Sequence, residues 1–133
     1  MMDQDYELVV IGSGPAGQKA AINAAKLGKR VAVIERAGMV GGVSVHGGAI
    51  PSKTLRDAIL YLTGFNERSF FYGQDYRLRD QISREEIASR VRTIVTRETN
   101  LVRSQFSRNR VTELDGTARF LDPHTLEVTS PAG

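Results

Sequence analysis

The fold of this chain is decided by the stretch Gly12-Ser13-Gly14-Pro15-Ala16-Gly17. It fits the G-x-G-x-x-G pattern, which connects a strand to a helix in dinucleotide-binding units. The apolar run at 6–11 predicts a buried parallel strand, and the alanine-rich run at 18–27, closed by Gly28, predicts a helix. A second β-branched run, Val31 to Ile34, completes a strand–helix–strand unit with the usual right-handed crossover. We therefore expect an α/β, Rossmann-like fold with a parallel sheet.

Each glycine of this turn has its own expected role. Gly12 makes the tight turn, Gly14 lets the backbone approach a pyrophosphate, and Gly17 lets the helix pack closely on the strand. The N–H groups at the start of the helix then favour the phosphate charge. Glu35 ends the second strand, where a carboxylate accepts hydrogen bonds from ribose hydroxyls and repels a 2′-phosphate. This pairing predicts FAD or NAD at the site rather than NADP; the alternative for Glu35 is a surface acid at a strand end.

The rest of the chain carries weaker signals. The glycine-rich segment 38–48 predicts a loop, and Pro51 is suited to be the first residue of a helix that runs to about Leu62. Residues 64–82 suggest an irregular connection. Ser83 and Glu86 form a capping box ahead of a long helix. The apolar face expected for that helix consists of Ile87, Val91, Ile94, Val95, Val102 and Phe106. The tail 111–128 predicts antiparallel strands with a turn at Asp122-Pro123-His124.

Composition narrows the possible classes of protein. With 133 residues, 41% hydrophobic and 25% charged, the chain should form one globular domain or part of one. The net charge of +3 comes largely from arginines between Arg77 and Arg110, which we interpret as a solvated helix face and not as a nucleic-acid site. The N-terminus is acidic, and no apolar run approaches the roughly 20 residues that cross a bilayer. We expect a cytoplasmic protein that binds neither membrane nor nucleic acid. His46 and His124 have no acidic cluster nearby, so no metal is predicted.

A second motif distinguishes between the two dinucleotides. The stretch Gly41-Gly42-Val43-Ser44-Val45-His46-Gly47-Gly48-Ala49-Ile50-Pro51-Ser52-Lys53 resembles the flavin-side segment of the class I pyridine nucleotide–disulfide oxidoreductases. In that family the segment reads approximately Gly-Gly-x-Cys-x-x-x-x-Cys-x-Pro-Ser-Lys. The resemblance implies FAD as the cofactor. The cofactor-binding residues expected from the turn and this segment together are Gly12, Gly14, Pro15, Ala16, Gly17, Glu35, Arg36, Gly41, Gly42, Ser44 and Lys53.

The chain departs from the family at its two redox cysteines. Ser44 and Ala49 occupy those positions, and the chain has no cysteine elsewhere. A hydroxyl cannot form the disulfide or the thiolate that accepts electrons from a flavin, so dithiol chemistry is excluded on this chain. Hydride transfer through a flavin remains, between nicotinamides or to another acceptor.

Within the family, the chain is most similar to the soluble pyridine nucleotide transhydrogenases. The similarity includes Ile-Pro-Ser-Lys-Thr-Leu-Arg (50–56) and Gly-Thr-Ala-Arg-Phe-Leu-Asp-Pro-His-Thr-Leu (116–126). It implies hydride exchange between NADH and NADP and a homodimer. It also implies a catalytic role for Lys53, near the reactive nitrogen of the flavin, where a cation stabilises the reduced ring; the alternative is an exposed lysine in the first turn of a helix.

Family members also have a nicotinamide-binding domain and a dimerisation domain. We therefore expect residues 1–133 to be the N-terminal part of an FAD-binding domain, itself incomplete, and inactive alone. NAD(P) would bind in the parent enzyme through a further domain. The sequence is also compatible with three alternatives: an NAD-dependent Rossmann dehydrogenase without flavin, a non-catalytic nucleotide-binding fragment, and a flavin enzyme that reduces a quinone or dye.

Overall fold

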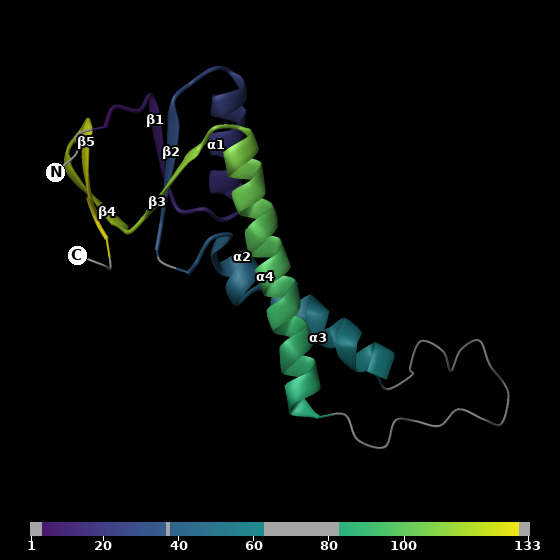
Figure 1. Ribbon diagram of the computed structural model, residues 1–133. Coiled ribbons are helices and arrows are strands. Elements are labelled where there is room, and N and C mark those ends of the chain that lie inside the picture. Colours follow the sequence, from purple (N-terminus) through teal and green to yellow (C-terminus); the bar gives the residue numbers. More distant parts are fainter. Residues whose placement is uncertain (1–3, 37, 63–82, 131–133) are drawn as a thin grey trace, which may run out of the picture.

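The computed structural model describes residues 4–36, 38–62 and 83–130. Its strands and helices alternate in the first half of the chain and end in three consecutive strands (Figure 1). The elements, in order, are β1 (Leu8–Ile11), α1 (Pro15–Lys26), β2 (Val31–Glu35), α2 (Gly42–His46), α3 (Ala49–Leu62), α4 (Arg84–Arg108), β3 (Thr112–Asp115), β4 (Thr117–Asp122) and β5 (Thr125–Thr129). The expected strand–helix–strand unit is confirmed in β1, α1 and β2.

Three parallel strands form the main sheet, with β2 between β1 and β3. Every residue of β2 is buried, because this central strand is covered on both faces. Ile34 lies beside Ile11 of β1 and Leu114 of β3. The carboxyl ends of all three strands therefore meet at one edge of the sheet, next to the glycine turn.

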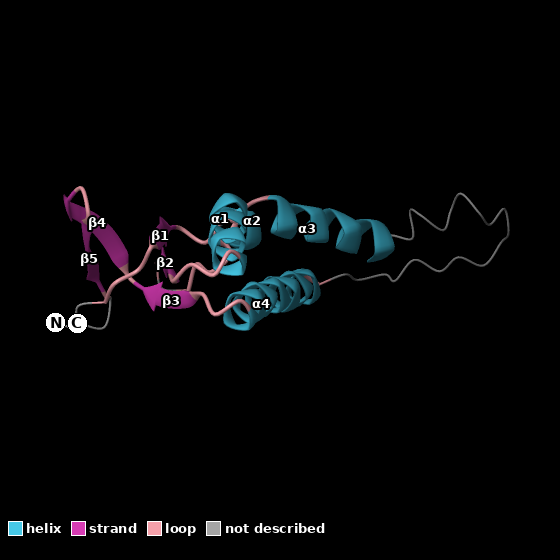
Figure 2. Ribbon diagram, turned by 90° about the horizontal axis from the view of Figure 1, so that it is seen from above, coloured by secondary structure: helices cyan, strands magenta, loops and turns pink. Residues whose placement is uncertain are grey.

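Helices and a hairpin cover opposite faces of this sheet. In Figure 2, α1 and α4 lie on one side and the β4–β5 hairpin lies on the other, while α3 and α4 extend together away from the sheet. The core joins β2, α1 and the end of α4, and its buried members are Ala21, Val31, Val33, Val40, Val102, Phe106 and Val111. Of the apolar face expected for α4, only Val102 and Phe106 are buried. The others are partly exposed because the first half of α4 packs on α3 beyond the sheet.

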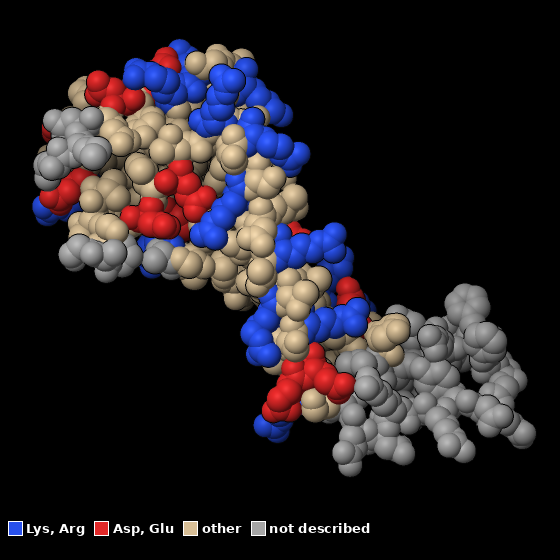
Figure 3. Space-filling view, viewed as in Figure 1, with Lys and Arg blue, Asp and Glu red and all other residues tan. Residues whose placement is uncertain are grey.

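The long helix α4 begins at the expected capping box. The Ser83 hydroxyl accepts a hydrogen bond from the Glu86 N–H (3.1 Å), and the Glu86 carboxylate accepts one from the Ser83 N–H (3.2 Å). Basic side chains line the length of this helix (Figure 3). All its arginines are exposed, as expected for a solvated face: Arg84, Arg90, Arg92, Arg97, Arg103 and Arg108. Within the described part of the chain, no helix has the length and apolar character required to cross a bilayer.

The glycine-rich segment contains a helix where we expected only a loop. Residues 42–46 form the short helix α2, which begins after Gly41 in the left-handed region (φ +98°). The next helix, α3, begins at Ala49 and not at Pro51. Proline is tolerated there because the N–H groups of the first helical turn have no partner within the helix. Residues 64–82, expected to be irregular, lie outside the described residues.

The tail is divided between two sheets, which corrects the expectation of a purely antiparallel tail. Residues 112–115 form β3 and pair in parallel with β2. Only β4 and β5 form the expected hairpin, whose turn is stabilised by a hydrogen bond from the His124 N–H to the Asp122 carboxylate (2.7 Å). Gly116 lies between the two sheets, and its N–H donates to the Glu35 carbonyl (2.9 Å). The chain thus leaves the parallel sheet immediately after β3.

Candidate nucleotide-binding site

The glycine turn connects the carboxyl end of β1 directly to α1. Gly12 has φ +99°, a conformation that side chains disfavour, and its N–H donates to the Ile34 carbonyl of β2 (2.8 Å). Gly14 is the N-cap of α1 with extended backbone, and no side chain caps this helix. Pro15 and Ala16 follow as exposed residues of the first turn. The N–H groups at this end of α1 are therefore available to an anionic ligand.

Gly14 and Gly17 are required for different reasons. A Cβ atom added to Gly17 would lie 2.0 Å from the Gly12 carbonyl oxygen, so only glycine allows the helix to pack this closely on the turn. A Cβ atom added to Gly14 would meet nothing within 4 Å. Gly14 thus borders open space at the start of α1, as expected of a residue that leaves room for a pyrophosphate.

Glu35 is a buried carboxylate at the end of β2, only 8% exposed. Its Oε2 accepts hydrogen bonds from the Ser13 N–H and the Ser13 hydroxyl, both 2.7 Å, and its Oε1 accepts one from the Arg36 N–H (2.9 Å). Burial acts to raise the pKa of the Glu35 carboxyl, but the hydrogen bonds from Ser13 and Arg36 outweigh it, and the pKa lies below its ordinary value. Glu35 is therefore ionised at neutral pH, and its burial and three hydrogen bonds distinguish it from an ordinary surface acid.

The second glycine motif lies against the first. Gly42 has φ +65°, and a Cβ atom there would lie 2.9 Å from the Gly14 Cα. Gly41 is buried, and its N–H donates to the Ser13 hydroxyl (2.9 Å). Two segments far apart in the sequence thus form one wall of the site.

These features fit a dinucleotide such as FAD. The open space at Gly14 and the N-terminus of α1 suit a pyrophosphate, and the ionised Glu35 suits a ribose hydroxyl. The Arg36 side chain is exposed beside Glu35. The first turn of α1 contains no acidic side chain that would repel the phosphates, and its backbone N–H groups would attract them.

The remaining predicted residues lie on the helices after the second motif. Ser44 is half-buried in α2, and a Cβ atom added to Gly48 would lie 3.3 Å from the Ser44 Cα. Lys53 is exposed on α3, a helix that packs mainly on α4 and α2. The structure thus unites the glycine turn, Glu35, Gly41 and Gly42, while Ser44 and Lys53 belong to the adjoining helical part.

The two histidines have different surroundings. His46 Nε2 donates a hydrogen bond to the Val40 carbonyl (2.8 Å), so its ring links α2 to the loop before it. His124 is exposed in the β4–β5 turn. Among the described residues, no group of three or more His, Cys, Asp or Glu side chains is placed to hold a metal ion.

Sequence reasoning missed the role of Ser13. It occupies a variable position of the glycine motif, yet it is completely buried and bonded to both Glu35 and Gly41. The spacing of the motif gives no indication of this role. The only available signal was a hydroxyl beside the glycine that begins the turn.

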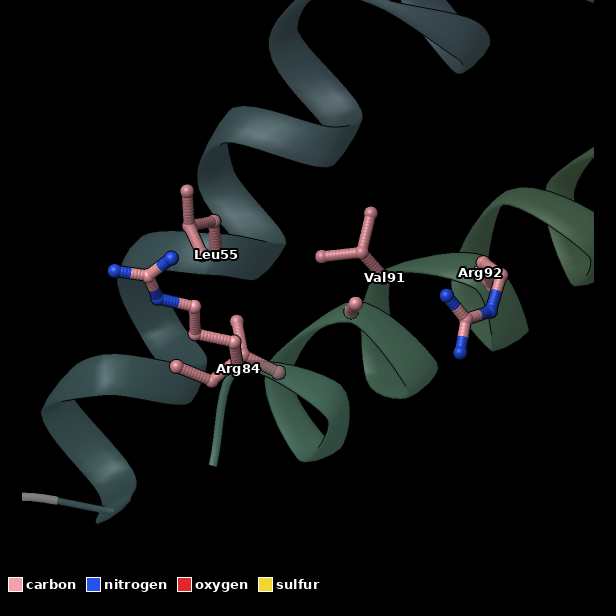
Figure 4. Close-up of a pocket in the computed structure, with 6 residues that line it drawn as sticks. Leu55, Arg84, Val91 and Arg92 are labelled. Atoms are coloured by element: carbon pink, nitrogen blue, oxygen red, sulfur yellow. The ribbon is translucent and has the colours of Figure 1, made fainter. Parts of the chain in front are cut away.

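A separate hollow of 480 Å³ lies between α3 and α4. Leu55 lines it from α3, while Arg84, Val91 and Arg92 line it from α4, together with Ile87 and Ala88 (Figure 4). None of these residues belongs to the glycine turn or to the end of β2. The hollow is therefore distinct from the candidate nucleotide-binding site at the edge of the sheet.

The chain is similar in sequence to known FAD-dependent proteins. The family model described as FAD dependent oxidoreductase matches residues 7–128. Soluble pyridine nucleotide transhydrogenases of Mycobacterium tuberculosis (strain ATCC 25177 / H37Ra) and Escherichia coli O139:H28 are 53% and 40% identical to this chain over 129 residues. Those alignments cover 97% of this chain and 27% of each relative, so the chain spans about a quarter of their length.

A solved structure has the same fold. The HOCl-induced flavoprotein disulfide reductase RclA from Escherichia coli is 28% identical, with a TM-score of 0.71 over 90% of this chain and 24% of its own. Its Cu(II) complex gives a TM-score of 0.76 at 29% identity, over 98% of this chain and 26% of its own. The chain lacks any cysteine, so it cannot itself supply the thiols of a disulfide reductase.

Proposed function

Because this chain belongs to the family of FAD-dependent oxidoreductases, we propose that it binds the adenosine and pyrophosphate groups of FAD. In this proposal residues 1–133 are the N-terminal part of an FAD-binding domain. The observation that carries it is the ionised, buried Glu35 beside a glycine turn that is open at Gly14. A buried carboxylate at the end of the second strand matches the hydroxyl groups of an adenosine ribose.

The residues of the chain divide the binding between them. Gly14 leaves space for the pyrophosphate, and the first N–H groups of α1 donate hydrogen bonds to it. Oxygen Oε1 of Glu35 accepts a hydrogen bond from the ribose. The adenosine and pyrophosphate groups are bordered by Pro15, Ala16 and Arg36. The part of FAD between the pyrophosphate and the flavin ring is lined by Gly41, Gly42 and Ser44. When bound, FAD supplies a ring that accepts and releases hydride.

The reaction that we propose is hydride transfer between nicotinamide dinucleotides, of the NADH/NADPH transhydrogenase type, without a redox disulfide. Two observations support it. The relatives that are 53% and 40% identical are named soluble pyridine nucleotide transhydrogenases, and Ser44 and Ala49 exclude a thiol at the expected redox positions. For the whole protein we further propose NAD(P) binding outside residues 1–133, a homodimer and a cytoplasmic location.

The proposal is tested by the visible absorption spectrum of the purified protein and by titration with FAD. We expect the protein to bind one FAD saturably, and the quenching of flavin fluorescence measures this binding. NAD should not compete with FAD. Competition by NAD without any retained flavin would favour a Rossmann dehydrogenase. Failure of the complete flavoprotein to bind either dinucleotide would contradict the proposed site.

Lys53→Ala is expected to slow flavin reduction while leaving FAD binding within about twofold of the parent. The lysine would stabilise negative charge on the reduced ring, and loss of such a charge-stabilising group lowers a rate by about 100-fold. Stopped-flow reduction by NADH in the complete flavoprotein measures this rate. Arg56→Ala, which removes another exposed cation from α3, is the matched control and should leave the rate unchanged. Equal reduction rates for Lys53→Ala and the parent would remove the catalytic role.

A further inference from the structure

Ser13 links three segments that the nucleotide site requires. Its hydroxyl donates to Glu35 Oε2 (2.7 Å) and accepts a hydrogen bond from the Gly41 N–H (2.9 Å). Its backbone N–H donates to the same Oε2 (2.7 Å). Ser13 is 0% exposed, so water cannot replace these bonds. The hydroxyl therefore uses both its donor and an acceptor site within the protein.

Resting on the proposed FAD site, we propose that Ser13 is a positioning residue: its hydroxyl fixes the Glu35 carboxylate and the second glycine motif relative to each other, so that Glu35 presents one oxygen, Oε1, to the ribose. The chemistry recognised at that oxygen is a hydroxyl donor on a nucleotide ribose. Ser13 itself acts through Glu35 and Gly41 and does not contact the reacting atoms.

A count of acceptor sites on Glu35 supports this. An ionised carboxylate has about four acceptor sites, two on each oxygen. Both sites of Oε2 are used by Ser13, and one site of Oε1 is used by the Arg36 N–H. One site remains, on Oε1. Since Oε2 is saturated within the protein, the ribose is expected to bind through that single preset position.

A small side chain without a hydroxyl group could not take over the role of Ser13. Glycine or alanine would satisfy the sequence motif at this position, but neither could donate to Glu35 or accept from Gly41. Gly41 is buried, so its N–H would be left without a partner, and it also begins α2 in a left-handed conformation. Loss of the hydroxyl is therefore expected to loosen the carboxylate and the start of α2 together.

The first test is the FAD affinity of Ser13→Ala, measured by fluorescence titration. We expect the dissociation constant to rise about tenfold, as for loss of one hydrogen bond to a charged group. Ser89→Ala, which removes an exposed serine hydroxyl from α4, should leave the affinity unchanged. Because Ser13 acts through Glu35, its substitution in a Glu35→Ala background should change the affinity less than threefold. Equal effects of Ser13→Ala in both backgrounds would overturn the proposal that Ser13 acts on the ribose through Glu35.

The acid side of the binding profile gives a second readout. Hydrogen bonds from Ser13 favour the ionised Glu35, so Ser13→Ala should raise the pKa of that carboxyl, and FAD affinity should be lost at a higher pH than in the parent. The charged groups next to Glu35 are Arg36, adjacent in the chain, and Asp115, its pairing partner in β3. On β4, which packs on β2, Arg119 is paired with Glu127. All of them remain in the variant. If FAD affinity fell at the same acidic pH in Ser13→Ala as in the parent, the proposal would be contradicted.

A measurement without FAD separates this inference from the proposed function. In the ligand-free chain, hydrogen exchange at the Gly41 amide should be faster in Ser13→Ala than in the parent, with the amides of β2 unchanged. If the parent bound no FAD, the proposed function would fail, and Gly41 exchange would still decide whether Ser13 positions the second motif. Unchanged protection of Gly41 would overturn the positioning role even if FAD bound normally.

Discussion

We expect the Gly14→Val variant to lose FAD retention while the chain remains folded. Gly14 has φ −62°, which any residue adopts, and a Cβ atom there would meet no neighbour within 4 Å. A valine side chain would therefore occupy the open space at the start of α1, where we place the pyrophosphate. We expect the FAD dissociation constant to rise by about 100-fold or more, which corresponds to about 2.7 kcal/mol of binding free energy. FAD titration and thermal unfolding of the same preparation measure both effects.

The control for this variant is Ala20→Val. It adds a β-branched side chain to an exposed position of α1, away from the turn, and should leave FAD affinity unchanged. If Gly14→Val still purified with stoichiometric flavin, the cofactor could not lie against this turn, and Glu35 would need another explanation.

The first half of the fold could be predicted because its signals are local. The apolar runs of β1 and β2, with the glycine turn between them, each specify their element within a few residues. The parallel strand β3 could not be predicted in this way. Its residues 112–115 alternate as a hairpin strand would, and only the pairing of Leu114 with Ile34, far away in the sequence, assigns them to the main sheet.

The site shows the same division between local and distant information. Glu35 was predictable because its place after the second strand is part of the motif. The helix α2 was not, because a segment so rich in glycine has low helix propensity, and its start depends on the left-handed Gly41 and on the contact of Gly42 with Gly14. The role of Ser13 could not be predicted, because it depends on hydrogen bonds to Glu35 and Gly41, which lie more than 20 residues away in the sequence.

Gly17→Ala is expected to destabilise the chain by about 3 kcal/mol or more, because the added Cβ overlaps a backbone carbonyl that cannot move freely. That Cβ would lie 2.0 Å from the Gly12 oxygen and 3.2 Å from the Val10 side chain. Gly17 is the third residue of α1, and alanine is the better helix former there by about 1 kcal/mol, so propensity alone would predict the opposite sign. Urea or thermal unfolding measures the difference in the free energy of unfolding.

The matched control is Gly14→Ala, the same chemical change three positions earlier in the same turn. Its Cβ meets open space, so its cost should stay within about 1 kcal/mol, the scale of an N-cap preference. The contrast between the two variants isolates close packing of α1 on the turn from any general intolerance of alanine there. Unfolding free energies for Gly17→Ala at or above that of the parent would mean that α1 shifts away from Gly12 at little cost. The close contact between Gly17 and Gly12 would then not be what keeps the turn rigid for the ligand.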